Sequence, residues 1–355
     1  MTRPLRTRPA VAPSDAAPVT IRRGHFWVGV ERNEHTGVAH GPMYVYWEAP
    51  AEIRQPYPIV LVHGGGGQGL DFMTTPDGRP GWVQLLVERG WLVYVVDRPA
   101  HGRSPYIPDL MGEPGPPLPP PVLRTIFGLD AGDPGLAALV AAHTQWPGSV
   151  SDPDDPAFLQ FAAAGGPFAA DAEARQSMER DRLVALLEHT GPAVLVGNSL
   201  GGPCSFLVAD SRPDLVAVLV QLEPAGPAFA TTFGPDTLQW GCAVAPLRYH
   251  PPAASHADLV LTDVDGTMLQ AEPARTLPHL AEVPIVVVTS EASVFADSDP
   301  RLVTYLRQAG CDAQHLSLPA HGVHGNSHGI MFERNHEHVL DTVLAVVAER
   351  LPGAR

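Results

Sequence analysis

Short, wholly apolar runs recur along the chain and alternate with stretches whose apolar residues have helical spacing. The runs that predict strands are YPIVLVHG (57–64), WLVYVVD (91–97), PAVLVGNS (192–199), LVAVLVQLEP (215–224), VPIVVVTSE (283–291) and QHLSLPA (314–320). Helices are predicted at GWVQLLVERG (81–90), from about Leu200, and at EHVLDTVLAVVAERL (337–351). This alternation is typical of a mostly parallel sheet buried on both faces by helices. The pattern therefore predicts an α/β fold, preceded by an antiparallel pair of strands at FWVGVE (26–31) and MYVYWEA (43–49).

Two stretches interrupt the alternation. Residues 104–170 and 225–257 are rich in proline and glycine and predict no regular core strand. Each follows the carboxyl end of a predicted strand, where the loops of parallel sheets carry function. We therefore expect one domain over residues 18–355 with both insertions as a partial cap, although plain surface excursions are the alternative. Residues 1–17, rich in proline, alanine and arginine, predict a disordered tail.

The aromatic residues of the two insertions favour a partly apolar pocket. Ordinary packing of the insertions on the domain would explain the same residues. They are Trp146, Phe158, Phe161, Phe168, Phe229, Phe233 and Trp240.

Charge and composition argue against some classes of binding partner. The chain has 355 residues and a formal net charge of −15, and its basic side chains are all arginine. An acidic chain without basic clusters argues against nucleic acid or an anionic membrane as a partner. No apolar stretch reaches the roughly 18 residues of a membrane span, and the N-terminus lacks the apolar segment of a signal peptide, so we expect a cytoplasmic protein. The sequence is compatible with a homo-oligomer.

Cysteine usage argues against a disulfide framework or a cysteine-based zinc site. Cys204, Cys242 and Cys311 are scattered and include no C-x-x-C pair. We expect free, buried thiols and no metal site.

The stretch LVGNSLGG (195–202) carries the clearest chemical signal. It contains G-x-S-x-G where an apolar strand ends and a helix is predicted to begin. In that context the pattern predicts a sharp turn that presents Ser199 as a nucleophile above the sheet, with the helix N-terminus stabilising nearby negative charge. A plain glycine-rich turn is the alternative reading.

A second glycine-rich stretch, VLVHGGGGQG (60–69), follows an earlier strand. It fits an oxyanion hole in which the N–H group of Gly65, or else of Gly64, acts together with that of Leu200. We expect His63 to orient this loop. The glycines also match G-x-G-x-x-G, but TTPDGRP follows instead of a helix, which argues against a dinucleotide site.

A serine nucleophile needs a general base and an acid that orients the base. In this architecture the acid and then the histidine follow the serine, which directs attention to PAHGVHGNSHGIMFERN (319–335). That stretch offers His321, His324 and His328, and spacing alone does not choose among them. A metal site is the weaker reading because the loop has no adjacent carboxylate at a suitable spacing.

The residues also leave the acid open. Glu223 ends one predicted strand, whereas Glu291 ends the next and is followed by Asp297. Either strand end could hold a carboxylate in the site. Asp97 precedes the serine and is expected to brace the loop at its own strand end.

The stretch DLVLTDVDGTM (258–268) resembles the first motif of the haloacid-dehalogenase phosphatases. There Asp263 would be a nucleophile and Asp265 an acid/base. The lysine of that family has no counterpart in this chain. We favour a turn at residues 263–266 that enters a helix-like stretch before Val283.

Several of these stretches together carry a family resemblance. They are HG with TTPDGRPGW (63–82), GNSLGG (197–202), EPAG (223–226) and GVHGNSH…ERN (322–335). Over about residues 20–350 the chain resembles the α/β-hydrolases, and more closely a small family of bacterial esterases. The resemblance implies an α/β-hydrolase fold with His328 as the base and Glu223 as the acid.

The resemblance also implies an activity. We expect a serine hydrolase that cleaves a carboxylic ester or lactone of a small molecule through an acyl-serine intermediate, without a cofactor. Amide or carbon–carbon bond hydrolysis, acyl transfer or a lyase step would use the same scaffold. A non-catalytic binding module is disfavoured because a nucleophile, a base, acids and an oxyanion loop occur in the expected order.

Overall fold

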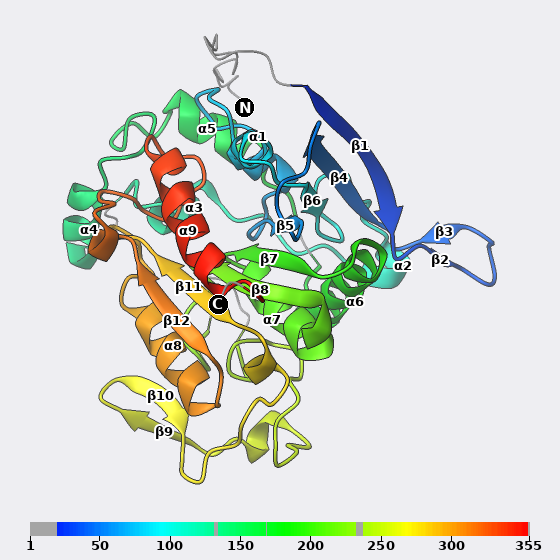
Figure 1. Cartoon of the computed structure of the whole chain (residues 1–355). Helices are drawn as coiled ribbons and strands as arrows, with labels where there is room; N and C mark the ends of the chain where they lie inside the picture. The colour runs from blue at the N-terminus through cyan, green and yellow to red at the C-terminus, as the bar shows by residue number, and fades with distance from the viewer. Residues whose placement is uncertain (1–19, 131–133, 168, 232–236, 354–355) are drawn as a thin grey trace.

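A mixed eight-stranded sheet forms the centre of the computed structural model, which describes residues 20–130, 134–167, 169–231 and 237–353 (Figure 1). The strands are β1 (Ile21–Val28), β4 (Met43–Pro50), β5 (Ile59–Val62), β6 (Val93–Asp97), β7 (Ala193–Asn198), β8 (Val216–Leu222), β11 (Ile285–Thr289) and β12 (Ala313–Ser317). Their spatial order is β1-β4-β6-β5-β7-β8-β11-β12. The predicted disordered tail at residues 1–17 lies outside the described residues, as do Phe168 and Phe233.

Each apolar run predicted to be a strand is a strand of this sheet. The six strands from β6 to β12 pair in parallel, whereas β1 and β4 form the predicted antiparallel pair at one edge. The strand order reverses at β5, which lies between β6 and β7. In sheets of this kind the crevice at the carboxyl ends beside such a reversal is the usual ligand site.

The strands are apolar throughout because side chains of both faces are buried. Val60 and Val62 of β5 join one apolar cluster, whereas Ile59 and Leu61 join the other. Successive residues of a strand point to opposite faces, so each run supplies both cores. Helices α6 (Ala172–Thr190), α7 (Gly201–Ser211) and α8 (Ser298–Gln308) cover the first face, and α1 (Trp82–Glu88) and α9 (His336–Arg350) cover the second.

The insertion at residues 104–170 is helical. It contains α2 (Pro108–Met111), α3 (Pro120–Ile126), α4 (Ala137–Ala142) and α5 (Pro156–Ala162). Short 3₁₀ turns occur here and elsewhere: η1 (Gly69–Phe72), η2 (Pro134–Leu136), η3 (Pro213–Leu215), η4 (His256–Asp258), η5 (Leu280–Glu282) and η6 (Pro319–His321).

The insertion at residues 225–257 packs differently. Its Trp240, Leu247 and Tyr249 are buried in the cluster that α7 and α8 cover, and Phe229 packs on the ring of Tyr305. These aromatic residues therefore support the core, as the packing interpretation expects.

The turn predicted at residues 263–266 is confirmed, but the helix-like stretch predicted between it and Val283 is wrong. Residues 261–270 form an antiparallel hairpin of β9 (Leu261–Val264) and β10 (Thr267–Gln270), outside the central sheet. Asp265 and Gly266 join the strands with φ values of 51° and 76°. An Asp-Gly pair with both φ angles positive is the usual two-residue hairpin turn, and this signal outweighs the helical reading. A second short ribbon pairs β2 (Glu31–Arg32) with β3 (Ala39–His40).

The predicted state of the cysteines is confirmed, because Cys204, Cys242 and Cys311 are buried free thiols. Within the described ranges, no group of three or more His, Cys, Asp or Glu side chains is arranged to hold a metal ion. Nor does any helix there combine the length and the apolar composition that crossing a bilayer requires.

Candidate active site

Ser199 lies at the turn between β7 and α7, at the carboxyl edge of the sheet. Its φ of 50° is left-handed, and its N–H group donates to Leu222 O at 3.1 Å across to β8. Gly201 packs so closely on the end of β5 that a Cβ atom there would lie 2.6 Å from His63 O. The G-x-S-x-G residues thus form the sharp turn that the sequence predicts, with Ser199 at its tip.

Glu223 and His328 meet below this turn. Glu223 follows β8, is fully buried, and its Oε2 lies 2.8 Å from Nδ1 of His328. Because a carboxylate accepts hydrogen bonds, Nδ1 carries the proton and Nε2 is left as the acceptor. His328 and Ser199 line the same pocket, yet no hydrogen bond joins the two side chains in the described part of the chain. Such contacts are often loose before substrate binds.

Two serines complete the environment of Glu223. The N–H and hydroxyl groups of Ser290 donate to Oε1, the N–H at 2.8 Å, and the Ser293 hydroxyl donates to Oε2 at 2.9 Å. These donors fix the orientation of the carboxylate towards His328. Sequence reasoning missed both serines, although they follow β11, the strand beside β8.

The lower-ranked candidates lie elsewhere. His324 and Glu291 contact each other at 3.3 Å, but both are exposed and neither lines the pocket. The N–H group of Gly325 also binds Glu291 and lowers the pKa of that carboxyl group. Asp297 is exposed just before α8, and His321 is exposed with its Nδ1 against Ser317 O at 3.1 Å.

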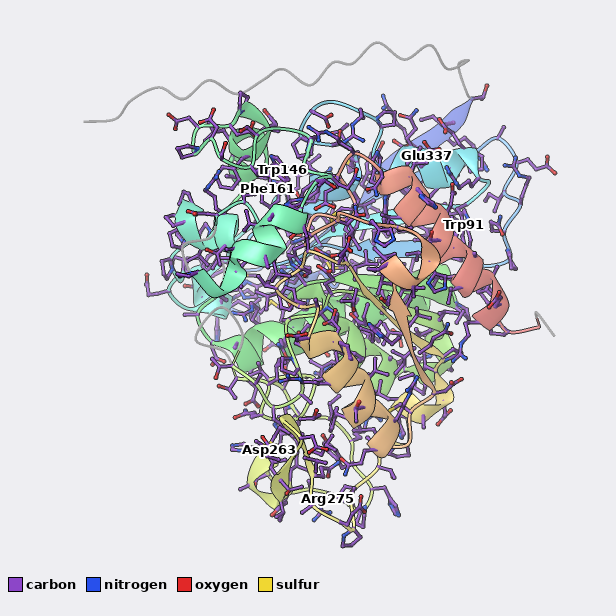
Figure 2. The ribbon with its side chains drawn as sticks, turned by 90° about the vertical axis from the view of Figure 1, so that its left-hand side faces the viewer. Trp91, Trp146, Phe161, Asp263, Arg275 and Glu337 are labelled. Carbon is purple, nitrogen blue, oxygen red and sulfur yellow. The ribbon has the colours of Figure 1, made fainter. Side chains whose placement is uncertain are left out.

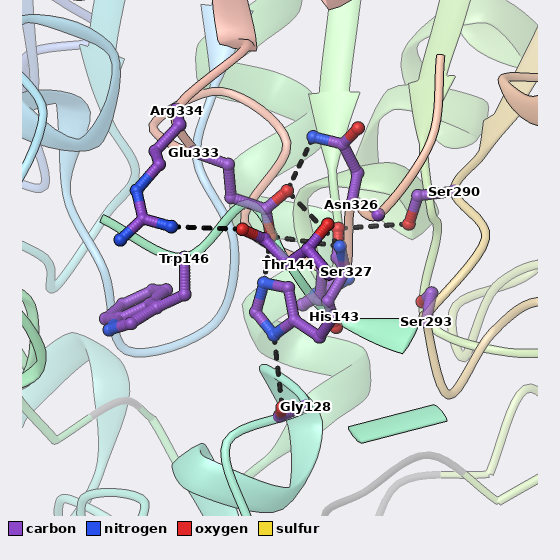
Figure 3. Close-up of polar contacts among 12 residues, drawn as sticks. Gly128, His143, Thr144, Trp146, Ser290, Ser293, Asn326, Ser327, Glu333 and Arg334 are labelled. Atoms are coloured by element: carbon purple, nitrogen blue, oxygen red, sulfur yellow. Dashed lines mark hydrogen bonds and ion pairs between the residues drawn. The ribbon is translucent and has the colours of Figure 1, made fainter. Parts of the chain in front are cut away.

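Figure 3 shows how the loop that carries His328 is held. Glu333 is fully buried and accepts hydrogen bonds from Ser327 N–H at 3.0 Å and from the Asn326 amide at 2.7 Å. The side chains of Asn326 and Asn335 also bond to each other. These residues explain the GVHGNSH…ERN block structurally, because its polar residues fix the backbone on either side of His328.

The cap reaches this network through His143, which follows α4. Its Nε2 lies 3.1 Å from Glu333 Oε1, while its Nδ1 lies 3.1 Å from Gly128 O (Figure 3). Burial opposes a positive charge on His143, but the hydrogen bond and charge of Glu333 outweigh it and raise the pKa of His143. Backbone hydrogen bonds from Thr144 N to Gly325 O and from Arg334 N to Gln145 O fasten the same two segments.

The TTPDGRPGW block also contacts the His328 loop. Arg79 donates to the carbonyl groups of Phe332, Glu333 and Arg334 at 3.0 to 3.2 Å. Asp77 receives the Nε–H of Arg79 at 2.8 Å and so orients the guanidinium group. Two sequence blocks about 250 residues apart therefore contact each other and together hold the backbone that follows His328.

Gly64 and Gly65 lie opposite the Ser199 turn. A Cβ atom on Gly65 would fall 2.3 Å from Leu200 Cδ1, so a side chain there would displace the end of the Leu200 side chain. The N–H groups of Gly65 and Leu200 donate no hydrogen bond within the described part of the chain, and both residues line the pocket. An oxyanion hole requires donors of this kind close to the nucleophile.

A buried polar cluster shapes the glycine loop from behind. Nε2 of His63 accepts from Arg98 N–H at 2.9 Å, so Nδ1 carries the proton and donates to Gly64 O. Burial and the Arg98 charge lower the pKa of His63 well below its usual value, which keeps the ring neutral. Arg98 itself binds Gly64 O at 2.7 Å and Glu179 at 2.6 Å. His63 thus orients the loop, as expected, with Arg98 and Glu179 as additional supports.

Asp97 braces the same region. Its Oδ1 accepts from Gly69 N–H at 2.8 Å, and its Oδ2 accepts from the backbone and side chain of Arg103 at 2.7 Å. This arrangement matches the structural role that the sequence suggests for Asp97.

The pocket above Ser199 encloses about 770 Å³, including its opening. The first insertion supplies about half of its apolar lining residues: Leu118, Leu123, Ile126, Phe127 and Phe161. Of the aromatic residues proposed from the sequence, Phe161 lines it, whereas Trp146 and Phe158 are buried in the packing behind. Ala225 is the part of the second insertion that reaches the pocket among the described residues.

Asp263 lies far from this pocket. Figure 2 shows it on the β9–β10 hairpin, at the opposite end of the molecule from Phe161 and Trp146. Its side chain is exposed and accepts from Gly266 N–H within the turn, and Asp265 is also exposed. Asp263 does not follow a central strand, so the phosphatase reading is wrong.

The comparisons with known proteins agree with this architecture. Residues 57–241 match the family described as alpha/beta hydrolase fold. The chain is 34% identical over 338 residues to the "Probable secreted lipase phiG" of Fungal sp. (strain ATCC 74256), covering 92% of this chain and 89% of that protein. The solved structure described as "a Novel Bacterial Esterase" has a TM-score of 0.62 and 22% identity, covers 96% of this chain and 99% of its own, and shares the fold.

Proposed function

Because this chain belongs to the α/β-hydrolase family, we propose that it hydrolyses a carboxylic ester or lactone of a small molecule through an acyl-serine intermediate. The contact of 2.8 Å between the buried Glu223 and His328, whose side chain lines the same pocket as Ser199, is the observation that carries the proposal. The names lipase and esterase of two similar proteins favour an ester over other acyl compounds.

In this proposal the Ser199 hydroxyl attacks the substrate carbonyl and passes its proton to Nε2 of His328. The N–H groups of Gly65 and Leu200 stabilise the oxyanion, with Gly64 as the neighbouring donor. His328 then returns the proton to the leaving alcohol. Water attacks the acyl-serine, again with His328 as the base, and releases the acid. Glu223 holds the imidazole in the required tautomer and stabilises its charged form.

Replacement of the nucleophile tests the proposal. Ser199→Ala should lower kcat for p-nitrophenyl acyl esters and lactones by about 10³-fold or more. It should also abolish labelling by a fluorophosphonate probe, which bonds to an activated serine. Ser255→Ala is a matched control, because Ser255 is an exposed serine before the β9–β10 hairpin.

The outcomes separate the remaining possibilities. Near-normal turnover by Ser199→Ala contradicts the proposal. Labelling at Ser199 without hydrolysis of esters or lactones would instead point to amides, carbon–carbon bonds, acyl transfer or a lyase step on the same scaffold. The cytoplasmic location stays a prediction, and the fungal relative is named as secreted.

A further inference from the structure

Asp71 is an ionisable side chain of the pocket that the proposed reaction does not use. The pocket is lined by 17 residues, of which Asp71 and His328 are the ones with ionisable side chains. Ser199 and His328 have roles in the proposed chemistry, and the Asn198 amide donates to Leu222 O. Asp71 therefore places a carboxyl group, without an assigned task, in an otherwise mostly apolar wall.

The surroundings of Asp71 contain no counter-ion. Its Oδ2 accepts the N–H group of Gln68 at 3.3 Å, and no ion pair joins it to an arginine within the described residues. The nearby cation, Arg103, is paired with Asp97 at 2.7 Å. Burial and the charge of Asp97 raise the pKa of Asp71 to about 7. A carboxylate in this position is destabilised unless a positive group approaches it.

The backbone is shaped to bring this carboxyl group close to the glycine loop. A Cβ atom on Gly67 would lie 2.2 Å from Asp71 Oδ2, so a larger residue would displace the carboxyl group. The loop is tied to the cap by Gly166 N–H on Gly66 O at 3.1 Å and by the Gln68 amide on Ala164 O at 3.2 Å. Asp71 therefore stands on a fixed wall of the same hollow as Ser199.

The other walls offer aromatic rings. Phe127 lies 4.5 Å from Phe161 and 5.1 Å from the His328 ring, measured between centroids, and Phe161 lies 5.2 Å from Phe332. The faces of aromatic rings attract cations, most strongly where water is excluded. The formal net charge of −15 also favours the approach of a cation.

On the premise that the proposed esterase function holds, we propose that Asp71 and the rings of Phe127, Phe161 and Phe332 form a subsite for a cationic ammonium group of the substrate. The cation supplies the counter-charge that Asp71 lacks, and the rings contact its alkyl groups. The preferred substrate is then an ester whose ammonium group and carbonyl carbon fit together into this one pocket, the first beside Asp71 and the second beside Ser199.

A pair of esters of equal shape tests this subsite. Trimethylammonioethyl butyrate carries a permanent charge, and 3,3-dimethylbutyl butyrate replaces the nitrogen by carbon. Above pH 7 the wild type should show a kcat/KM about tenfold higher for the charged ester. This ratio should fall as pH drops through the pKa of Asp71, near 7. Since both esters would react through the same triad, the pH dependence of the shared chemical steps cancels in the ratio.

Substitution of Asp71 isolates its contribution. Asp71→Asn should bring the ratio close to one and remove its pH dependence, whatever happens to the absolute rates. Asp109→Asn makes the same change at an exposed position of the cap and should keep the wild-type ratio. A hydroxyalkyl ester of similar length tests whether Asp71 instead accepts a hydrogen bond from a neutral hydroxyl group of the substrate. A higher kcat/KM for this ester than for the charged ester would overturn the cation subsite.

Direct binding keeps the test independent of turnover. Calorimetry of the wild type measures the dissociation constants of choline and of 3,3-dimethylbutanol. It requires no ester hydrolysis and no variant protein. Tighter binding of choline above pH 7 supports the subsite even if no ester is cleaved, in which case only the esterase proposal fails. Equal binding of the two alcohols, or a wild-type ratio near one, overturns the subsite.

Discussion

Ser199 and Glu223 share a backbone conformation that side chains other than glycine seldom adopt. Their φ values are 50° and 46°, and they follow the adjacent parallel strands β7 and β8. Left-handed conformations of such residues cost about 1 kcal/mol or more and persist where the surrounding structure imposes them. Here both side chains are lifted above the carboxyl edge of the sheet, where His328 can be reached.

The choice of acid can be tested by comparing two carboxylates. Glu223→Gln should lower kcat by about 10²–10⁴-fold, because a neutral amide no longer stabilises the charged imidazole or selects its tautomer. Glu291→Gln should retain most of the activity, since Glu291 is exposed outside the pocket. Steady-state kinetics on one p-nitrophenyl ester measures both. The opposite ranking would move the acid to the end of β11.

The choice of base follows the same logic. His328→Ala should reduce kcat by about 10³-fold or more. Substitution of His324 or His321, both exposed, should have a small effect. Thermal unfolding of each variant shows whether a loss of activity reflects loss of the fold. Inactivation at His324 with survival at His328 would overturn the assignment.

At the scale of elements, the site joins segments that are remote in sequence. The sequence predicts the strand ends that carry Ser199 and Glu223, since apolar periodicity locates strands reliably. It does not choose among three histidines of one loop, because the selection rests on Glu333, His143 and Arg79, which act through long-range contacts. The resemblance to bacterial esterases selected His328 without supplying that physical reason.

The His143–Glu333 contact predicts a dependence of stability on pH. The raised pKa of His143 means that its charged form stabilises the fold. This contribution is complete below the ordinary pKa of about 6.5 and is lost as pH rises through the raised value. His143→Gln should lower the free energy of unfolding by about 3 kcal/mol at pH 6, and by less at high pH.

Urea unfolding of the wild type and of His143→Gln between about pH 6 and pH 9 measures the difference in their free energy of unfolding. His189→Gln is a suitable control, since His189 lies in the last turn of α6 and its ring packs against Phe26 of β1. A difference that does not change with pH would show that His143 contributes through packing alone.

Glu333 should act on the reaction through the position of His328. Glu333→Gln can still accept from Ser327 N–H but loses the charge that attracts His143. A shift of the base by about 1 Å can cost about 10²-fold in rate. We expect kcat to fall with little change in KM, and Glu333→Ala to be worse. Because an unfolded fraction also lowers the apparent kcat without changing KM, thermal unfolding of each variant must show that the fold is kept; a loss of activity that follows a loss of folded protein would contradict the positioning role.

For the whole molecule, the sequence predicts the parallel sheet, its flanking helices and the edge pair. The remainder depends on long-range packing. The two insertions have similar compositions, yet one forms a helical roof over the pocket and the other fills the core beside α7 and α8. The β9–β10 hairpin was misread because the apolar residues of its short strands are partly exposed, so they do not report burial.

The acidic surface predicts a dependence on salt. If a cationic ester is attracted by the net charge of −15, its kcat/KM should fall as sodium chloride rises from about 0.01 M to about 0.5 M. The neutral 3,3-dimethylbutyl ester should change little over the same range. Stopped-flow or initial-rate measurements at low substrate concentration compare the two. Parallel changes for both esters would assign the effect to the enzyme's structure rather than to attraction.

The hydrogen bond from Ser199 N–H to Leu222 O ties the proposed nucleophile to the strand pair that also carries Glu223. Opening of that pair requires the core to open, whereas the His328 loop includes the exposed residues His321, Gly322 and His324 and is fastened to the cap by hydrogen bonds. Local openings of proteins follow such differences in burial. We therefore expect hydrogen–deuterium exchange to be slow at Ser199 and faster in residues 321–327. Under mild denaturation the chain would lose its base first, while the nucleophile and the acid stay assembled on a native sheet.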